Sequence, residues 1–253
     1  YVSTKEPFMK LRHQGIILGE NSKKMSKSLG NVVNPDDVVK EYGADAMRLF
    51  EMFMGPLEEM KPWSTRGVEG VFRFLNRVWR LYIDESGTLD SSIKDVEPSP
   101  DVERVYHATV KKVGDDIERL SFNTAIAQMM IFVNEVMKSE RKPRQLLEPF
   151  VLVLAPFAPH VAEELWQKLG HTKSVAYETW PEYDPSKLIE TSVEVVLQVN
   201  GKIRSKISVR KDTSEHELET LCLADENIRK YLNGGAIMKK IIVKNKLVNL
   251  VVK

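Results

Sequence analysis

The spacing of apolar residues changes near residue 190, and this change divides the chain into two kinds of structure. Between Ser64 and Leu169, apolar side chains recur every three or four residues, as they do along the buried face of a helix. Between Val193 and Val209 they alternate with polar residues, as they do in a strand with one buried face. The sequence therefore predicts a helical bundle followed by a small module that contains a sheet.

The helical part is expected to contain four or five helices that form a bundle. Its first helix starts at Ser64, and a polar connection from Asp84 to Pro100 follows it. Three prolines interrupt the last apolar run, and a proline inside a helix removes a hydrogen bond and clashes with the preceding turn. We therefore expect this run to break into two helices or to kink. The three prolines are Pro149, Pro156 and Pro159.

The module after residue 190 contains a strong hairpin signal, because Asn200-Gly201 separates two alternating runs. A capping box at Ser214–Glu217 predicts a helix after the hairpin, so residues 191–253 are expected to form a small α+β domain. This segment has a net charge of +5, from twelve Lys/Arg against seven Asp/Glu, whereas residues 1–61 are neutral and residues 62–190 carry −4. A basic module on a neutral-to-acidic body indicates an anionic partner.

The composition narrows the class of protein. Hydrophobic residues make up 42% and charged residues 29% of the 253 positions, which is typical of a folded soluble protein. No apolar stretch approaches membrane-spanning length, and the start of the chain, which lacks an initiator methionine, resembles neither a signal nor a transit peptide.

The single cysteine, Cys222, excludes an internal disulfide and a multi-cysteine zinc site, and we expect a buried thiol. No metal site is predicted, and His160 is expected to be a structural residue at a helix start.

The segment Lys24-Met25-Ser26-Lys27-Ser28, called the lysine loop below, is the strongest chemical signal. It follows an apolar run, and after it Asn34-Pro35 predicts the start of a helix that should break at Gly43 and resume to Phe53. Lysine supplies point charge and serine supplies hydrogen bonds, so the loop suits a mobile clamp on a polyphosphate. The alternative is a solvated surface turn.

The lysine loop resembles the signature loop of class I aminoacyl-tRNA synthetases, and the segments around it resemble the leucyl-tRNA synthetase family in the same order. Together they extend over essentially the whole chain. These segments are Glu6–Gly19, Tyr42–Phe50, Ala155–Trp166 and Gln198–Arg204.

The resemblance implies a mainly α chain. Residues 1–62 would be the end of a class I Rossmann catalytic domain with the lysine loop and stem-contact helices, residues 63–188 a helical anticodon-binding-type bundle, and residues 191–253 an α+β domain that reaches the tRNA elbow. ATP would bind at Lys24, Met25, Ser26, Lys27 and Ser28, with Lys27 and Lys24 stabilising charge on the leaving pyrophosphate. Mg²⁺ would accompany ATP, with no metal site in this chain.

The family's His-x-Gly-His-type element, leucine pocket and editing domain have no counterpart in this sequence. The resemblance therefore implies two partners, tRNA(Leu) and an N-terminal catalytic half in the same chain or another subunit, and no activity of this chain alone. The expected compartment is the cytoplasm, or the matrix of an organelle. A stand-alone tRNA-binding accessory subunit remains an alternative. A fragment of a valyl, isoleucyl or methionyl enzyme is a weaker one, because their typical C-terminal modules differ from residues 191–253.

Two sets of cations are candidate tRNA contacts. Along the strand after the Asn-Gly turn, period-two spacing predicts that three cations share one face, where they would meet phosphates and 2′-hydroxyls. These are Lys202, Arg204 and Lys206, which Lys244 and Lys246 would extend. On the first helix of the bundle, the candidates are Arg73, Arg77 and Arg80. The alternative for each set is an ordinary solvated face.

Overall fold

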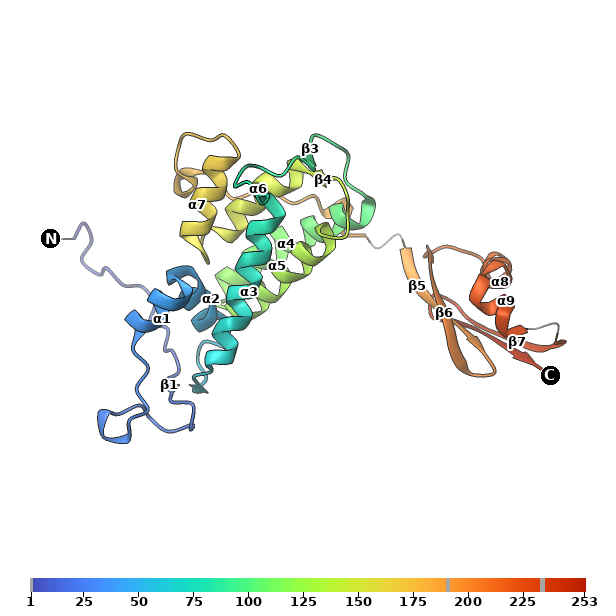
Figure 1. The fold of residues 1–253 in the computed structure, drawn as a ribbon, viewed down its shortest axis with the longest axis horizontal. Helices are drawn as coiled ribbons and strands as arrows, with labels where there is room; N and C mark the ends of the chain where they lie inside the picture. The colour runs from blue at the N-terminus through green and yellow to red at the C-terminus, as the bar shows by residue number, and fades with distance from the viewer. Residues whose placement is uncertain (1, 190–191, 233–234) are drawn as a thin grey trace. The chain divides into compact units, whose positions relative to one another are not determined.

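The computed structural model describes residues 2–189, 192–232 and 235–253 (Figure 1). The chain folds into two compact units, Tyr1–Leu188 and Ile189–Lys253, each with its own hydrophobic core. Within the described residues, no helix has the length and apolar character needed to cross a membrane.

The first unit begins with the segment that carries the lysine loop. Strand β1 (Ile17–Leu18) pairs in parallel with β2 (Lys61–Pro62). Between them lie helices α1 (Pro35–Tyr42) and α2 (Ala44–Phe53), as the sequence predicted. The Asn34 side chain accepts a hydrogen bond from the Asp36 N–H and caps α1, and Gly43, at φ +88°, separates the two helices.

Five helices form the bundle, also as predicted. They are α3 (Thr65–Tyr82), α4 (Pro100–Glu118), α5 (Phe122–Val136), α6 (Arg144–Leu154) and α7 (Pro159–Lys168). The last apolar run breaks between α6 and α7, around Pro156, whereas Pro149 lies inside α6. The polar connection after α3 also contributes β3 (Ile93–Lys94), which pairs in parallel with β4 (Lys142–Pro143).

Most of the apolar side chains of α3 face the core of this unit. Val71, Leu75, Val78 and Tyr82 are buried, but Phe72 is 36% exposed. The Phe72 ring instead packs edge-on against Tyr42 of α1, with the ring centroids 5.7 Å apart. Phe72 therefore helps to hold α1 against the rim of the bundle.

The second unit is the predicted α+β module. Its four strands have the order β6-β5-β8-β7, in which β5 and β8 are parallel and the other neighbours antiparallel. The strands are β5 (Ser192–Val199), β6 (Lys202–Arg210), β7 (Ile237–Val243) and β8 (Leu247–Val252). Asn200 and Gly201 form the predicted turn, at φ +50° and +74°. Helices α8 (Glu215–Ala224) and α9 (Glu226–Leu232) cover one face of the sheet (Figure 1).

Candidate functional site

The lysine loop is an ordered structure built from short-range hydrogen bonds. Lys24 forms an isolated antiparallel bridge with Leu18, which closes the turn before the loop. Ser26 then caps a short 3-10 helix, η1 (Lys27–Leu29), because its Oγ accepts a hydrogen bond from the Leu29 N–H at 3.3 Å. The helix ends at Gly30, which lies in the left-handed region at φ +60°. The loop is therefore preformed.

The functional groups of the loop point in two directions. Lys24, Lys27 and Ser28 are exposed, so two ammonium groups and one hydroxyl are accessible to an anion. Met25 is half-buried and packs against the core of the first unit. The loop is thus anchored on its apolar side, and its charged side is presented to solvent.

Glu20, which sequence analysis did not identify, attaches the loop to the bundle. One of its carboxylate oxygens accepts hydrogen bonds from the N–H of Thr65 at 3.1 Å and from the Thr65 Oγ1 at 3.0 Å, at the start of α3. These bonds lower the pKa of Glu20. A carboxylate at a helix N-terminus is favoured by the helix dipole, so the turn before the lysine loop is fixed to the first helix of the bundle.

A second attachment joins α2 to α7. Asp45 is 5% exposed, and its Oδ2 accepts a hydrogen bond from the Val161 N–H at 2.7 Å. Its Oδ1 lies 2.8 Å from the Nδ1 of His160, so His160 has the predicted place at a helix start. Arg48 of the same helix α2 donates a hydrogen bond to the Pro156 carbonyl at 3.2 Å. The segment that carries the loop and the last helix of the bundle therefore meet through α2.

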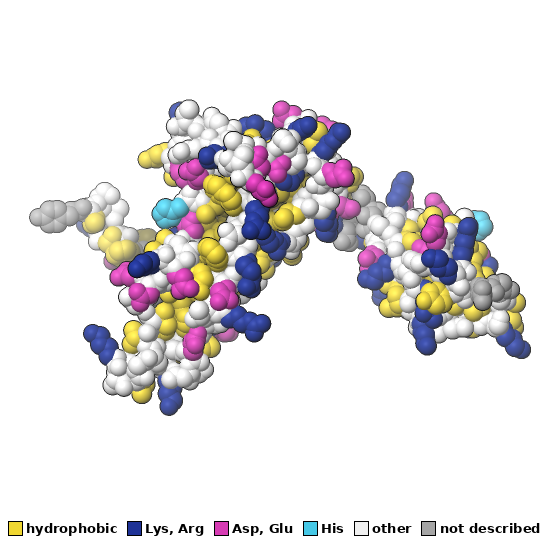
Figure 2. Space-filling model, viewed as in Figure 1, with side chains coloured by type: hydrophobic (Ala, Val, Ile, Leu, Met, Phe, Trp, Pro, Cys, Tyr) yellow, Lys and Arg dark blue, Asp and Glu magenta, His cyan; other side chains and the backbone are white. Residues whose placement is uncertain are grey.

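The arginines predicted on α3 lie along one exposed side of that helix. Figure 2 shows Lys and Arg side chains gathered along α3. Arg73 and Arg80 are exposed and Arg77 is half-buried. In the part of the chain that the structure describes, Arg73 is the only one of the three that forms a salt bridge, at 3.9 Å from Glu69. Arg66 is also exposed and lies seven residues before Arg73 on the same side of the helix. From Arg66 to Arg80 the arginines therefore form a stripe about 21 Å long.

The prediction that Lys202, Arg204 and Lys206 share one face of β6 is wrong. Leu197 pairs with Ser205, but the next residue of β5 pairs with Ile203, so Arg204 is the extra residue of a β-bulge. A bulge interrupts the period-two alternation on which the prediction depended. Residues before and after Arg204 therefore do not follow a single alternation, and the even-numbered positions of β6 do not all lie on one face of the sheet.

The three cations have different surroundings. The guanidinium of Arg204 stacks on Tyr231 of α9, with its carbon 3.7 Å from the ring centroid, on the side of the sheet that the helices cover. Lys202 pairs with Val199, whose side chain belongs to the core on that same side. Lys206 lies on the uncovered side and forms a salt bridge with Glu194 at 2.8 Å. The structure thus brings Lys202 and Arg204 to one side and Lys206 to the other.

Lys244 and Lys246 are exposed in the turn between β7 and β8. The Lys246 carbonyl accepts a hydrogen bond from the Val196 N–H, and Val196 also pairs with Lys206. Strand β5 lies between β6 and β8, so the backbone of this turn is two strand spacings, about 10 Å, from the backbone of Lys206. Lys202 pairs with Val199, which lies three residues after Val196 along β5, so Lys202 is farther from this turn than Lys206 is.

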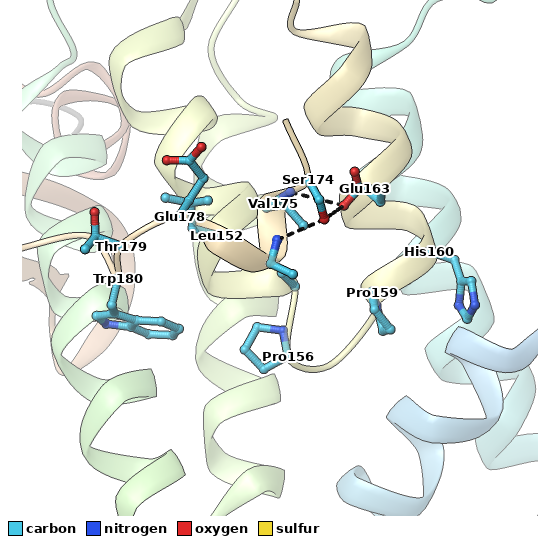
Figure 3. Close-up of a pocket in the computed structure, with 12 residues that line it drawn as sticks. Leu152, Pro156, Pro159, His160, Glu163, Ser174, Val175, Glu178, Thr179 and Trp180 are labelled. Carbon is cyan, nitrogen blue, oxygen red and sulfur yellow. Dashed lines mark hydrogen bonds between the residues drawn. The ribbon is translucent and has the colours of Figure 1, made fainter. Parts of the chain in front are cut away.

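A pocket of about 580 Å³ lies between the α6–α7 turn and residues 174–180 (Figure 3). Its lining is mainly apolar and includes Leu152, Pro156 and Trp180. The carboxylate of Glu163 is already used, because one oxygen accepts hydrogen bonds from Ser174 Oγ at 2.9 Å and from the Val175 N–H at 3.1 Å. The His160 ring is turned away from Trp180, toward α2 (Figure 3). We assign no function to this pocket.

Two further predictions concern metal ligands and the thiol. Across the described ranges, no group of three His, Cys, Asp or Glu side chains is arranged to hold a metal ion. Cys222 is fully buried in the core of the second unit, as predicted, and burial raises the pKa of its thiol to about 11. Cys222 is thus a core residue of the α+β module.

Comparison with known protein families places these features in one class. Residues 1–61 match the family of class I tRNA synthetases (I, L, M and V), and residues 101–219 match the anticodon-binding domain of tRNA ligases. The first match includes the lysine loop, and the second begins in α4. The chain therefore belongs to the class I aminoacyl-tRNA synthetases.

Within that class, the chain is homologous over its whole length to leucine–tRNA ligases, as its motifs predicted. It is 57% identical over 253 residues to leucine–tRNA ligase of two strains of Leptospira biflexa serovar Patoc, Patoc 1 / Ames and Patoc 1 / ATCC 23582 / Paris. It is 32% identical to agnB2 LeuRS of Agrobacterium radiobacter K84, solved as a ternary complex with tRNA and LeuAMS, with a TM-score of 0.64. The chain spans 29% of the length of the Leptospira relatives and 34% of the solved LeuRS chain.

Proposed function

We propose that this chain is the part of a leucine–tRNA ligase that supplies the lysine loop and the tRNA-binding surfaces. The complete enzyme would convert ATP, leucine and tRNA(Leu) to leucyl-tRNA, AMP and diphosphate. The observation that carries this proposal is the intact lysine loop, whose two ammonium groups are exposed beside an anchored Met25, in a chain 57% identical to leucine–tRNA ligases.

In the proposed mechanism, the lysine loop acts on the triphosphate of ATP. Lys27 would neutralise negative charge that develops on the leaving pyrophosphate, with Lys24 and Ser28 in support, while the backbone at Met25 meets the edge of the nucleobase. This is electrostatic stabilisation of a transition state and needs no proton transfer by the loop. Mg²⁺ would accompany ATP in the complete enzyme and would be held by residues outside this chain.

Each of the three segments would contact a different part of the tRNA. Residues 1–62 would contribute the lysine loop and contact the acceptor stem, residues 63–188 would bind the tRNA body through the α3 arginines, and residues 191–253 would contact the elbow. The leucine pocket and the rest of the ATP site would come from an N-terminal catalytic half. We propose the cytoplasm, or the matrix of an organelle, as the compartment.

Substitution of Lys27 tests the proposal in the complete enzyme that includes this chain. Lys27→Ala should lower the rate of adenylate formation, measured by ATP–pyrophosphate exchange, by at least a hundredfold, which corresponds to about 3 kcal/mol. Binding of tRNA should stay within twofold of the unsubstituted enzyme. Lys40→Ala, which removes an exposed lysine of α1 outside the loop, is the matched control. Equal activity of the Lys27 and Lys40 variants would remove the loop from the mechanism and favour a tRNA-binding accessory role.

A further inference from the structure

The side chain of Asn31 holds the lysine loop together from inside. Asn31 follows Gly30, the left-handed residue that ends η1, and its carboxamide is half-buried. Its Oδ1 accepts a hydrogen bond from the Ser26 N–H at 2.9 Å. Its Nδ2 donates to the Asn21 Oδ1 at 3.1 Å and to the Lys24 carbonyl at 3.3 Å, and a longer contact of 3.5 Å reaches the Lys23 carbonyl.

These contacts use both N–H groups and the oxygen of one carboxamide. Two of these partners are backbone groups on either side of Met25, and the third is the side chain of Asn21 in the turn before the loop. A single side chain therefore ties the lysine loop to that turn. Gly19, in the neighbouring turn, leaves room for this carboxamide. A Cβ at that position would lie 2.7 Å from the Asn31 Nδ2, closer than such atoms can approach. The carboxamide therefore occupies a close-fitting polar site under the loop.

We propose that Asn31 is a positioning residue, which sets the relative positions of Lys24 and Lys27 before ATP binds. This inference rests on the proposed function of the loop. Asn31 bonds the carbonyl of Lys24 directly, and it bonds the amide of Ser26, the residue that caps the short helix in which Lys27 is first. A clamp preformed in this way loses less conformational freedom when it closes on a polyphosphate.

The geometry requires an amide at this position. Aspartate would keep an acceptor for the Ser26 N–H but would place carboxylate oxygen against the Lys24 carbonyl and the Asn21 Oδ1, where no donor remains. Alanine would remove all three bonds. Asn34 is a matched control, because it is also an asparagine with a side-chain-to-backbone bond, but its bond caps α1 and does not reach the loop.

The first test is amide hydrogen exchange of this chain. We expect Asn31→Ala and Asn31→Asp to speed exchange of the Ser26 amide at least tenfold, and Asn34→Ala to leave it within twofold. Asn21→Ala removes one of the three bonds and should give an intermediate effect, so it keeps the test usable if the Asn31 variants do not fold. Unchanged exchange of Ser26 in the variants would overturn the proposal.

The second test is kinetic and uses the complete enzyme. Asn31→Ala and Asn31→Asp should lower kcat of ATP–pyrophosphate exchange at least tenfold and leave the Kd for tRNA within twofold, and Asn34→Ala should change neither. Faster exchange of Ser26 with an unchanged kcat would show that the bonds serve stability alone and would refute the positioning role. If Lys27→Ala also leaves kcat unchanged, the proposed function of the loop fails, and the role of Asn31 in the reaction fails with it.

Discussion

Replacement of Asp45 by alanine should destabilise the first unit strongly, because this buried carboxylate caps a helix from another part of the chain. Asp45 lies in the first turn of α2, yet it accepts a hydrogen bond from the Val161 N–H in α7 at 2.7 Å. Loss of an N-cap side chain costs about 1 kcal/mol, and a hydrogen bond to a charged group contributes about 1.5–3 kcal/mol. These two estimates describe the same contact, so they are not added. The 2.8 Å contact with His160 adds little, because the His160 side chain is 74% exposed.

We therefore expect Asp45→Ala to lower the free energy of unfolding by about 2–3 kcal/mol, and to lower Tm by about 5–10 °C for a unit of this size. Tryptophan fluorescence is the appropriate probe, because all four tryptophans lie between Trp63 and Trp180 and so report the first unit alone. Urea unfolding followed at this signal gives the free energy without interference from the second unit.

The control is Asp101→Ala, which removes an exposed acid from the first turn of α4. Its interaction with the helix dipole contributes about 0.3–1 kcal/mol, so the two variants should differ clearly. If Asp45→Ala lies within about 0.5 kcal/mol of the unsubstituted chain, the range of ordinary surface substitutions, the contact between α2 and α7 does not hold the unit together.

Three further predictions concern the α+β module and the α3 arginines. Cys222 should resist alkylation in the folded chain below its pKa of about 11 and react only on unfolding; rapid reaction at pH 8 would contradict its burial. Tyr231→Leu removes the ring under Arg204, so it should destabilise the module by about 0.5–1 kcal/mol and speed Cys222 alkylation in mild urea about two- to fivefold, whereas Tyr231→Phe should not. Replacement of Arg73, Arg77 and Arg80 together by alanine should reduce the salt slope of tRNA binding by about one unit per arginine, and an unchanged slope would leave these residues a solvated face.

Local signals in the sequence were sufficient for the elements that depend on neighbouring residues. Asn34-Pro35 gave the start of α1, Gly43 its end, and Asn200-Gly201 the hairpin turn, because cap and turn preferences act within a few residues. The break after α6 followed from Pro156 in the same way. The order of motifs was sufficient for the family, which the homologues confirm.

The remaining features depend on partners that are distant in sequence or on small irregularities. Alternation along β6 predicted one basic face, but the bulge at Arg204 has no marker in the sequence and reverses the alternation. Asp45 and Val161 are 116 residues apart, so no local pattern joins them. Asn31 is only five residues from Ser26, and the Gly30-Asn31 pair after the lysine loop was a turn signal in the sequence that could have pointed to it.

The most direct test of the central claim is selective retention of tRNA by this chain. The immobilised chain is mixed with total tRNA at low and at moderate salt, and the retained tRNAs are sequenced. A leucine–tRNA ligase segment that carries the tRNA-binding surfaces should retain leucine tRNAs preferentially, with the preference preserved as salt rises. Retention of all tRNAs alike, lost as salt rises, would contradict the account and leave only a basic surface that binds RNA without specificity.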